Sequence, residues 1–73
     1  AEELERLESH IAQTATALRV AGPQGRRIDF LAQEILRESS TLGAKALSRT
    51  LADLAREIRL EAERIREQAQ NVE

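Results

Sequence analysis

Residues 22–38 read GPQGRRIDFLAQEILRE, and this stretch sets the boundary between two helices. Gly22 and Pro23 interrupt helical backbone, because proline disfavours the helical conformation in the residue before it. A first helix is therefore expected to end near Val20 and a second to begin near Gln24. The second helix carries apolar residues at helical spacing, namely Ile28, Leu31, Ile35 and Leu42.

The flanking segments carry helical patterns as well. The first helix has one face made of Leu4, Leu7, Ile11, Thr14 and Leu18. Gly43 suits the C′ position of the second helix, and the third helix starts at Ala44 or with a cap at Ser48 or Thr50. The third helix repeats, at nearly seven-residue spacing, Leu51, Leu54, Ile58, Ala62, Ile65, Ala69 and Val72. Such a repeat predicts a partner helix along its length.

Short connections between successive helices favour antiparallel neighbours. The sequence therefore predicts an all-α fold, an antiparallel three-helix hairpin assembly with a long C-terminal helix. Residues 1–73 make a single small helical domain, near the size at which one core barely sustains itself. We therefore expect an oligomer, and we expect the chain to be the C-terminal fragment of a longer one.

Composition excludes several kinds of protein. There are no cysteines, so disulfides and thiolate metal sites are absent, and a net charge of −2 argues against nonspecific attraction to nucleic acid. No segment has the apolar length of a membrane span or signal peptide, so we expect a cytoplasmic protein without a membrane partner. Because no Walker loop, dinucleotide fingerprint, zinc-ligand spacing or nucleophile elbow is present, no small-molecule cofactor is expected.

His10 is the only imidazole, the usual side chain for proton transfer near neutral pH and a ligand of Mn²⁺ or Zn²⁺. The alternative is a partly exposed histidine that pairs with Glu3 or Glu5.

Glu34 and Glu38 lie four residues apart, so their carboxylates share a helix face and suit a divalent cation, with Asp29 or His10 from elsewhere in an assembly. The alternative is solvated charge flanking Arg37. At about 100° per residue, one line of the second helix, pointing away from its apolar face, holds Asp29, Gln33, Leu36 and Ser40.

Arg26 and Arg27 occupy the first turn of the second helix, where the helix dipole disfavours positive charge. An RNA phosphate or a neighbouring subunit's carboxylate would account for them, and so would pairing with acidic residues of the first helix. The third helix carries Arg49, Arg56, Arg59 and Arg66 on one side. Glutamates lie among these arginines, which favours a helix laced with ion pairs over a nucleic-acid stripe.

Three stretches closely resemble one known family, the YicC-like bacterial endoribonucleases. Residues 22–38 follow its pattern GP-x-GR-x-LDFL-x-QE-x-x-RE, RLESH at 6–10 follows RL-x-SH, and IREQAQNVE at 65–73 follows IREQ-x-QN-x-E. Order and spacing hold without a gap over nearly the whole chain. This sequence departs from the family pattern at Thr14, Leu36, Ser40 and Ala44.

The resemblance implies the C-terminal helical domain of an oligomeric enzyme that hydrolyses RNA phosphodiesters with a divalent metal such as Mn²⁺ or Mg²⁺. The catalytic and metal-binding candidates it implies are His10, Asp29, Glu34 and Glu38. The RNA-binding candidates are Arg26, Arg27, Arg37 and Lys45. The alternative is a non-catalytic helical oligomerisation module, diverged or designed, with catalysis elsewhere. The sequence leaves open whether residues 1–73 are active alone.

Overall fold

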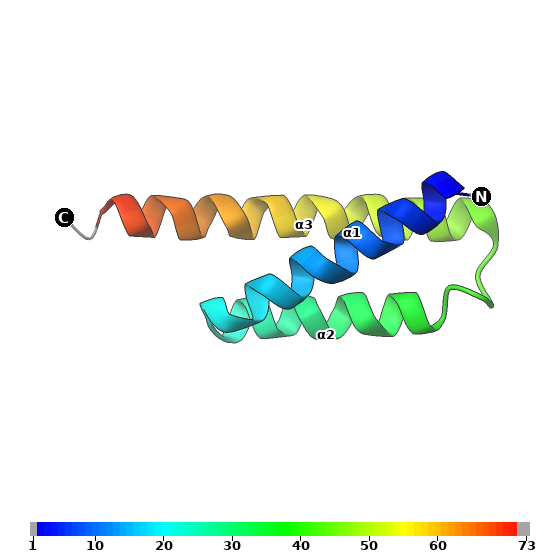
Figure 1. Ribbon diagram of the computed structural model, residues 1–73, viewed down its shortest axis with the longest axis horizontal. Helices are drawn as coiled ribbons and strands as arrows, with labels where there is room; N and C mark the ends of the chain where they lie inside the picture. Colours follow the sequence, from blue (N-terminus) through cyan, green and yellow to red (C-terminus); the bar gives the residue numbers. More distant parts are fainter. Residues whose placement is uncertain (1, 72–73) are drawn as a thin grey trace.

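Residues 2–71 are described by the structure, a computed structural model, and they form three α-helices and one short 3₁₀ helix (Figure 1). The elements in chain order are α1 (Glu2–Leu18), η1 (Arg19–Ala21), α2 (Pro23–Arg37) and α3 (Ala44–Gln70). No strand occurs within this range, so the all-α class predicted from the sequence is confirmed.

The chain reverses direction between α1 and α2 at Gly22 (Figure 1). Gly22 has φ 128° and ψ −169°, a region that glycine enters without steric cost. Pro23 follows in the first turn of α2, where a missing N–H leaves no helical hydrogen bond unmade. The Gly22 carbonyl accepts the backbone N–H of Arg26 at 3.0 Å, which starts α2. This boundary agrees with the sequence-based expectation.

The connection from α2 to α3 differs from the expectation. α2 ends at Arg37, so Ser40 and Leu42 lie outside the helix on which the sequence placed them. The hydroxyl and backbone N–H of Thr41 both donate to the carbonyl of Glu38, at 2.8 Å and 3.0 Å. Hydroxyl side chains compete in this way with the next helical hydrogen bonds, and the chain turns instead of continuing.

Gly43 is the N-cap residue of α3, so its predicted position at C′ of α2 is wrong. Its backbone is extended, with φ −65° and ψ 157°, and its carbonyl accepts the backbone N–H of Leu47 at 2.9 Å. α3 therefore begins at Ala44, the earliest of the three starts that the sequence allowed.

Apolar side chains from all three helices form one core. Its buried members are Ile11, Ala15 and Leu18 of α1, Ile28 and Ala32 of α2, and Leu47, Leu51, Leu54 and Ile58 of α3. Leu7, expected in the core, is 39% exposed. Two alanines take central places because small side chains let α1 and α2 approach closely.

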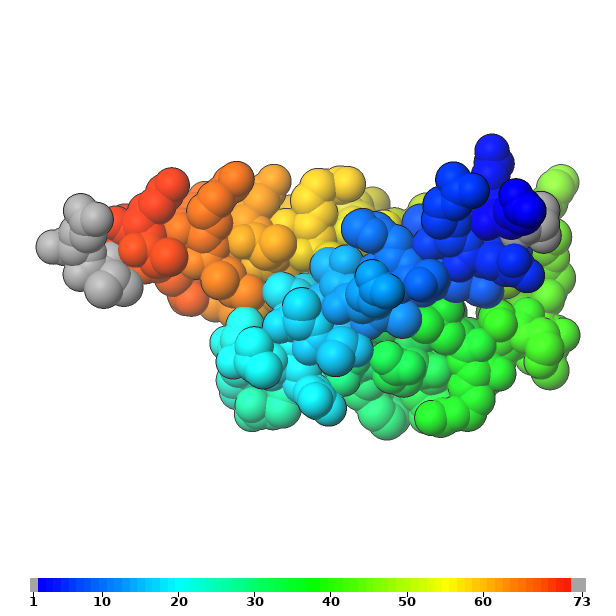
Figure 2. Space-filling view, viewed as in Figure 1, coloured from blue at the N-terminus to red at the C-terminus, as the bar shows by residue number. Residues whose placement is uncertain are grey.

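α3 reaches well beyond the other two helices (Figures 1 and 2). Its 27 residues make a rod of about 40 Å, whereas the 17 and 15 residues of α1 and α2 reach about 26 Å and 23 Å. Buried positions of α3 stop at Glu61, and beyond it Ala62 and Ala69 are exposed and Ile65 is half-buried. Val72 of the predicted repeat lies outside the described residues. Ile65 still packs against the edge of the core, whereas α1 and α2 do not cover Ala62 and Ala69.

Among the helices described, none is both long and apolar enough to cross a bilayer.

Candidate functional site

Asp29 is half-buried on α2, where this helix packs against α1. Its Oδ1 accepts hydrogen bonds from Oγ1 of Thr16 at 3.2 Å and from Nε2 of Gln33 at 3.4 Å. Thr16 lies 13 residues earlier and on another helix, so the sequence pattern did not identify it. The two donors hold this carboxylate at the edge of the α1–α2 contact.

The predicted polar line through Asp29 is wrong at two of its four positions. Leu36 packs against the core, and Ser40 lies in the turn after α2. Because Gly25, Ala32 and Leu36 join Ile28 on the inner side, the buried face of α2 centres about 300° from Asp29, which is only about 60° away around the helix. Asp29 therefore borders the buried face instead of pointing away from it.

Glu34 and Glu38 lie on a different side of α2. At about 100° per residue they stand roughly 140° and 180° from Asp29. Glu34 Oε1 accepts a hydrogen bond from Nη1 of Arg37 at 3.0 Å, and the Arg37 side chain is exposed whereas Glu34 is half-buried. Glu38 is exposed, and its backbone N–H caps the end of α2. Within one copy, Glu34 and Glu38 therefore flank Arg37 as surface charges, which is the alternative to a metal site considered from the sequence.

One copy does not fit a complete metal site. In the part of the chain that the structure describes, no three His, Asp or Glu side chains gather closely enough to hold a metal ion. His10 belongs to α1, and Asp29 stands on another side of α2 from Glu34 and Glu38. Metal dependence therefore stays a prediction, and a site would need ligands from outside residues 2–71 of one copy.

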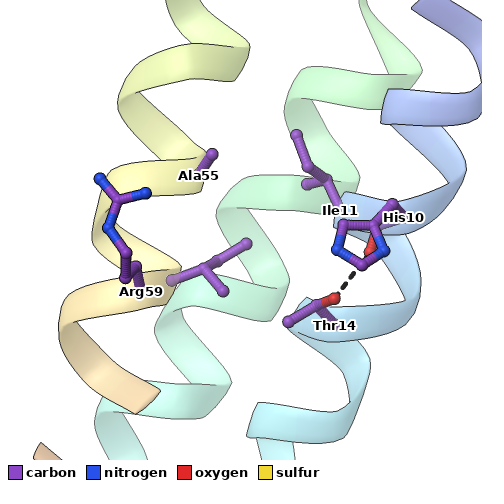
Figure 3. Close-up of a pocket in the computed structure, with 6 residues that line it drawn as sticks. His10, Ile11, Thr14, Ala55 and Arg59 are labelled. Atoms are coloured by element: carbon purple, nitrogen blue, oxygen red, sulfur yellow. Dashed lines mark hydrogen bonds between the residues drawn. The ribbon is translucent and has the colours of Figure 1, made fainter. Parts of the chain in front are cut away.

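His10 is exposed on α1 and lines a hollow of about 240 Å³ between α1 and α3 (Figure 3). Its backbone carbonyl accepts the hydroxyl of Thr14 at 2.8 Å. No carboxylate among residues 2–71 forms an ion pair with its ring, so the predicted alternative of a Glu3 or Glu5 partner is not seen.

The predicted phosphate-binding cations fall into two groups. Arg27 and Arg37 are paired, Arg27 through Nη2 to Oε1 of Glu57 at 3.1 Å. The partner of Arg27 thus belongs to α3 and not to the first helix, which was one of the alternatives considered from the sequence. Arg26 and Lys45 are exposed, and within residues 2–71 neither has a carboxylate within 4.0 Å. Lys45 lies in the first turn of α3.

Glu61 is a buried carboxylate that the sequence pattern did not identify. It is only 6% exposed, and it accepts Nε of Arg64 at 3.0 Å together with Nη2 of the same residue. The hydrogen bond from Arg64 lowers the pKa of Glu61, partial burial opposes this, and the charges of Arg64 and Arg27 add to the lowering. The three-residue spacing of Glu61 and Arg64 was the feature of the sequence from which their pairing could have been predicted.

The other arginines of α3 are only partly paired. Nη2 of Arg56 lies 3.8 Å from Oδ1 of Asp53, whereas Arg59 has no carboxylate within 4.0 Å among the described residues. Of the four arginines predicted on one side, the ion-pair interpretation thus holds for Arg56 and fails for Arg49, Arg59 and Arg66, none of which has a carboxylate within 4.0 Å among the described residues.

Comparison with known proteins identifies the family. The family described as "Endoribonuclease YicC-like, C-terminal" matches residues 1–73. The chain is 42% identical over 73 residues to a protein of Haemophilus influenzae named "Probable endoribonuclease YicC", and 43% identical over 72 residues to one of Clostridioides difficile with the same name. These alignments cover 100% and 99% of this chain and 25% of each relative.

The chain spans about a quarter of the length of the curated relatives that it matches. No solved structure matches it. The family match extends over every residue and confirms the resemblance seen in residues 6–10, 22–38 and 65–73. The chain therefore belongs to the YicC-like endoribonuclease family, of which it is a C-terminal domain.

Proposed function

We propose that this domain is part of a cytoplasmic endoribonuclease that hydrolyses RNA phosphodiesters with a divalent metal. The observation that carries the proposal is the family match over all 73 residues, with relatives named as probable endoribonucleases. Those relatives are about four times as long as this chain, so other segments of the protein, or other copies, are the source of the remaining metal ligands.

Each candidate side chain has a role in this proposal. His10 is exposed and transfers a proton at the scissile phosphate. Asp29, oriented by Thr16 and Gln33, contributes a carboxylate to a site completed from elsewhere. Glu34 and Glu38 are metal-ligand candidates on the opposite side of α2, where a second copy would meet them.

The cations supply electrostatic attraction to the RNA backbone. Arg26 and Lys45 contact phosphates directly, since no neighbouring carboxylate in residues 2–71 competes for them. Arg27 and Arg37 contact phosphates more weakly, because each is already paired with a glutamate. RNA binding is therefore expected to weaken as salt concentration rises, and to depend more on Arg26 than on Arg27 or Arg37.

The test is RNA cleavage by two proteins, the 73-residue chain and a graft in which it replaces the matching quarter of the Haemophilus influenzae relative. Mixed-sequence RNA is incubated with Mn²⁺, Mg²⁺ or EDTA, and fragments are followed on a gel. We expect cleavage by the graft that EDTA stops and that His10→Ala or Asp29→Asn abolishes. An active graft that tolerates both substitutions would place the chemistry outside this domain.

A second candidate function is a non-catalytic oligomerisation module. The exposed apolar positions at the end of α3 favour it, because Ala62 and Ala69 continue the core repeat while Ile65 is the last position that still packs against the core. Under this hypothesis Ala69→Asp lowers the sedimentation coefficient of the chain, whereas Glu63→Asp, also at an exposed position of this helix, leaves it unchanged. Leu54 and Ile58 are unsuitable for this test, because they are buried in the core of one copy.

A further inference from the structure

The hollow between α1 and α3 has two kinds of lining (Figure 3). Its six lining residues are His10, Ile11 and Thr14 of α1 and Ala55, Ile58 and Arg59 of α3. Ile11 and Ile58 belong to the buried core, so they form an apolar floor. His10 and Arg59 are exposed and stand at its rim on opposite helices.

The rim is cationic and lacks an acidic partner. No carboxylate of the described residues lines this hollow, and Arg59 has none within 4.0 Å. A second hollow between α2 and α3 differs in this respect, because Glu57 and Glu61 line it and Arg64 is paired there. Only the first hollow therefore offers a positive charge to an anionic ligand.

Size and shape restrict what can enter. At about 240 Å³ the hollow is smaller than the roughly 300–1,000 Å³ of pockets that bury a drug-sized molecule. Proteins bind unstacked bases between apolar surfaces and flat side chains, and histidine rings and arginine planes both serve. This hollow has one histidine ring, that of His10, and one arginine plane, that of Arg59, above an apolar floor.

We infer that the hollow takes one unstacked base of single-stranded RNA, while Arg59 contacts an adjoining phosphate. The inference rests on the proposed function, because it names a contact of that RNA substrate. It also places the substrate beside His10, the candidate for proton transfer. An aromatic side chain of another protein copy would fill the same space, but it would leave Arg59 without an anion.

The test measures RNA affinity after the hollow is filled. Ala55→Leu places a larger apolar side chain in the hollow and keeps helix propensity high. Ala52→Leu, one turn earlier and exposed, is the matched control. Arg59→Gln removes the rim charge, and Arg66→Gln, on an exposed position of the same helix, controls for net charge. Circular dichroism checks that all four variants are folded.

Dissociation constants are measured for a short single-stranded RNA and for a series carrying one abasic site at successive positions. We expect Ala55→Leu to weaken binding about 5- to 150-fold, the range for one stacked base, and Ala52→Leu to leave it unchanged. The decisive result is that one abasic position weakens binding to the wild-type chain but not to Ala55→Leu. A purely structural effect of leucine would not remove this dependence on the base.

Two outcomes would overturn the inference and separate it from the proposed function. If the abasic penalty persists in Ala55→Leu while the graft still cleaves RNA, the hollow does not hold a base, although the proposed function stands. If Ala55→Leu instead changes the sedimentation coefficient and RNA binding is unaffected, the occupant is another protein copy. If neither wild-type chain nor graft binds or cleaves RNA, the proposed function fails and the inference fails with it.

Discussion

Gly25 of α2 lies so close to Leu18 of α1 that a Cβ atom at position 25 would stand 1.8 Å from the Leu18 backbone oxygen. The Leu18 carbonyl carbon would be 2.7 Å away. Both atoms are backbone, so no side chain can move aside to make room. The contact of the two helices next to their shared turn thus depends on a missing side chain.

Gly25→Ala is expected to destabilise the fold strongly. Overpacking typically costs about 1–3 kcal/mol, and a domain of this size has only a few kcal/mol in total. The matched control is Gly43→Ala, where nothing lies within 4 Å of an added Cβ, and we expect a change below about 1 kcal/mol. Urea denaturation followed by circular dichroism measures both. Equal effects of the two substitutions would contradict this account.

Glu61 is expected to make the stability of the fold depend on pH. Its pKa is lowered, chiefly by the hydrogen bond from Arg64. A carboxyl with a lower pKa in the folded than in the unfolded state stabilises the fold above its unfolded pKa of about 4.3, and this stability is lost as pH falls through the folded pKa. The urea midpoint of the wild-type chain should therefore fall more steeply below about pH 5 than that of Glu61→Gln.

Glu63→Gln is the control for this pH dependence, because Glu63 is exposed on the same helix. It should retain the wild-type slope of urea midpoint against pH. A wild-type slope in Glu61→Gln as well would mean that other carboxyls cause the acid sensitivity.

Leu51→Ala should remove most of the stability of the domain. Leu51 is 0% exposed at the centre of the core, and truncations of this kind cost about 2–5 kcal/mol. Leu60→Ala, at a position 58% exposed on the same helix, should change stability by less than about 0.5 kcal/mol. Thermal unfolding measures both variants. A large loss for Leu60→Ala would show that this side chain is covered in solution.

Arg26→Gln should reduce the salt dependence of RNA binding. Removing one phosphate contact to a single strand lowers the slope of log K against log salt by about 0.7. Arg56→Gln changes net charge equally, but Arg56 faces Asp53 rather than the proposed RNA, so its slope should stay unchanged. Binding titrations at several salt concentrations measure the slopes. An unchanged slope for Arg26→Gln would remove Arg26 from the RNA-binding surface.

The helix boundaries that depend on local chemistry could be predicted from the sequence. Gly22 and Pro23 act on their own backbone, and the end of α1 and the start of α2 follow from them. The end of α2 was predicted too late. Thr41 donates a hydrogen bond to the Glu38 carbonyl and closes a turn there, and the spacing of apolar residues carries no information about such side-chain hydrogen bonds.

Features that depend on how helices meet could not be predicted. Asp29 and Thr16 are neighbours only because α1 and α2 cross at that level. The burial of Glu61 and the link from Arg27 to Glu57 likewise require the position of α2 on α3. The candidate residues came from side-chain chemistry together with the family resemblance, and the structure shows which of them lie together in one copy.

α3 is one unbroken helix, so its covered and uncovered parts rotate together as a rigid rod. Anything that grips the turns beyond Glu61 also turns Arg59, whereas His10 stays with α1. A rotation of the rod changes the width of the hollow between these two side chains. If copies assemble at the free end and the hollow binds a base, as proposed, this rotation would couple the two events, and by reciprocity each would shift the equilibrium of the other.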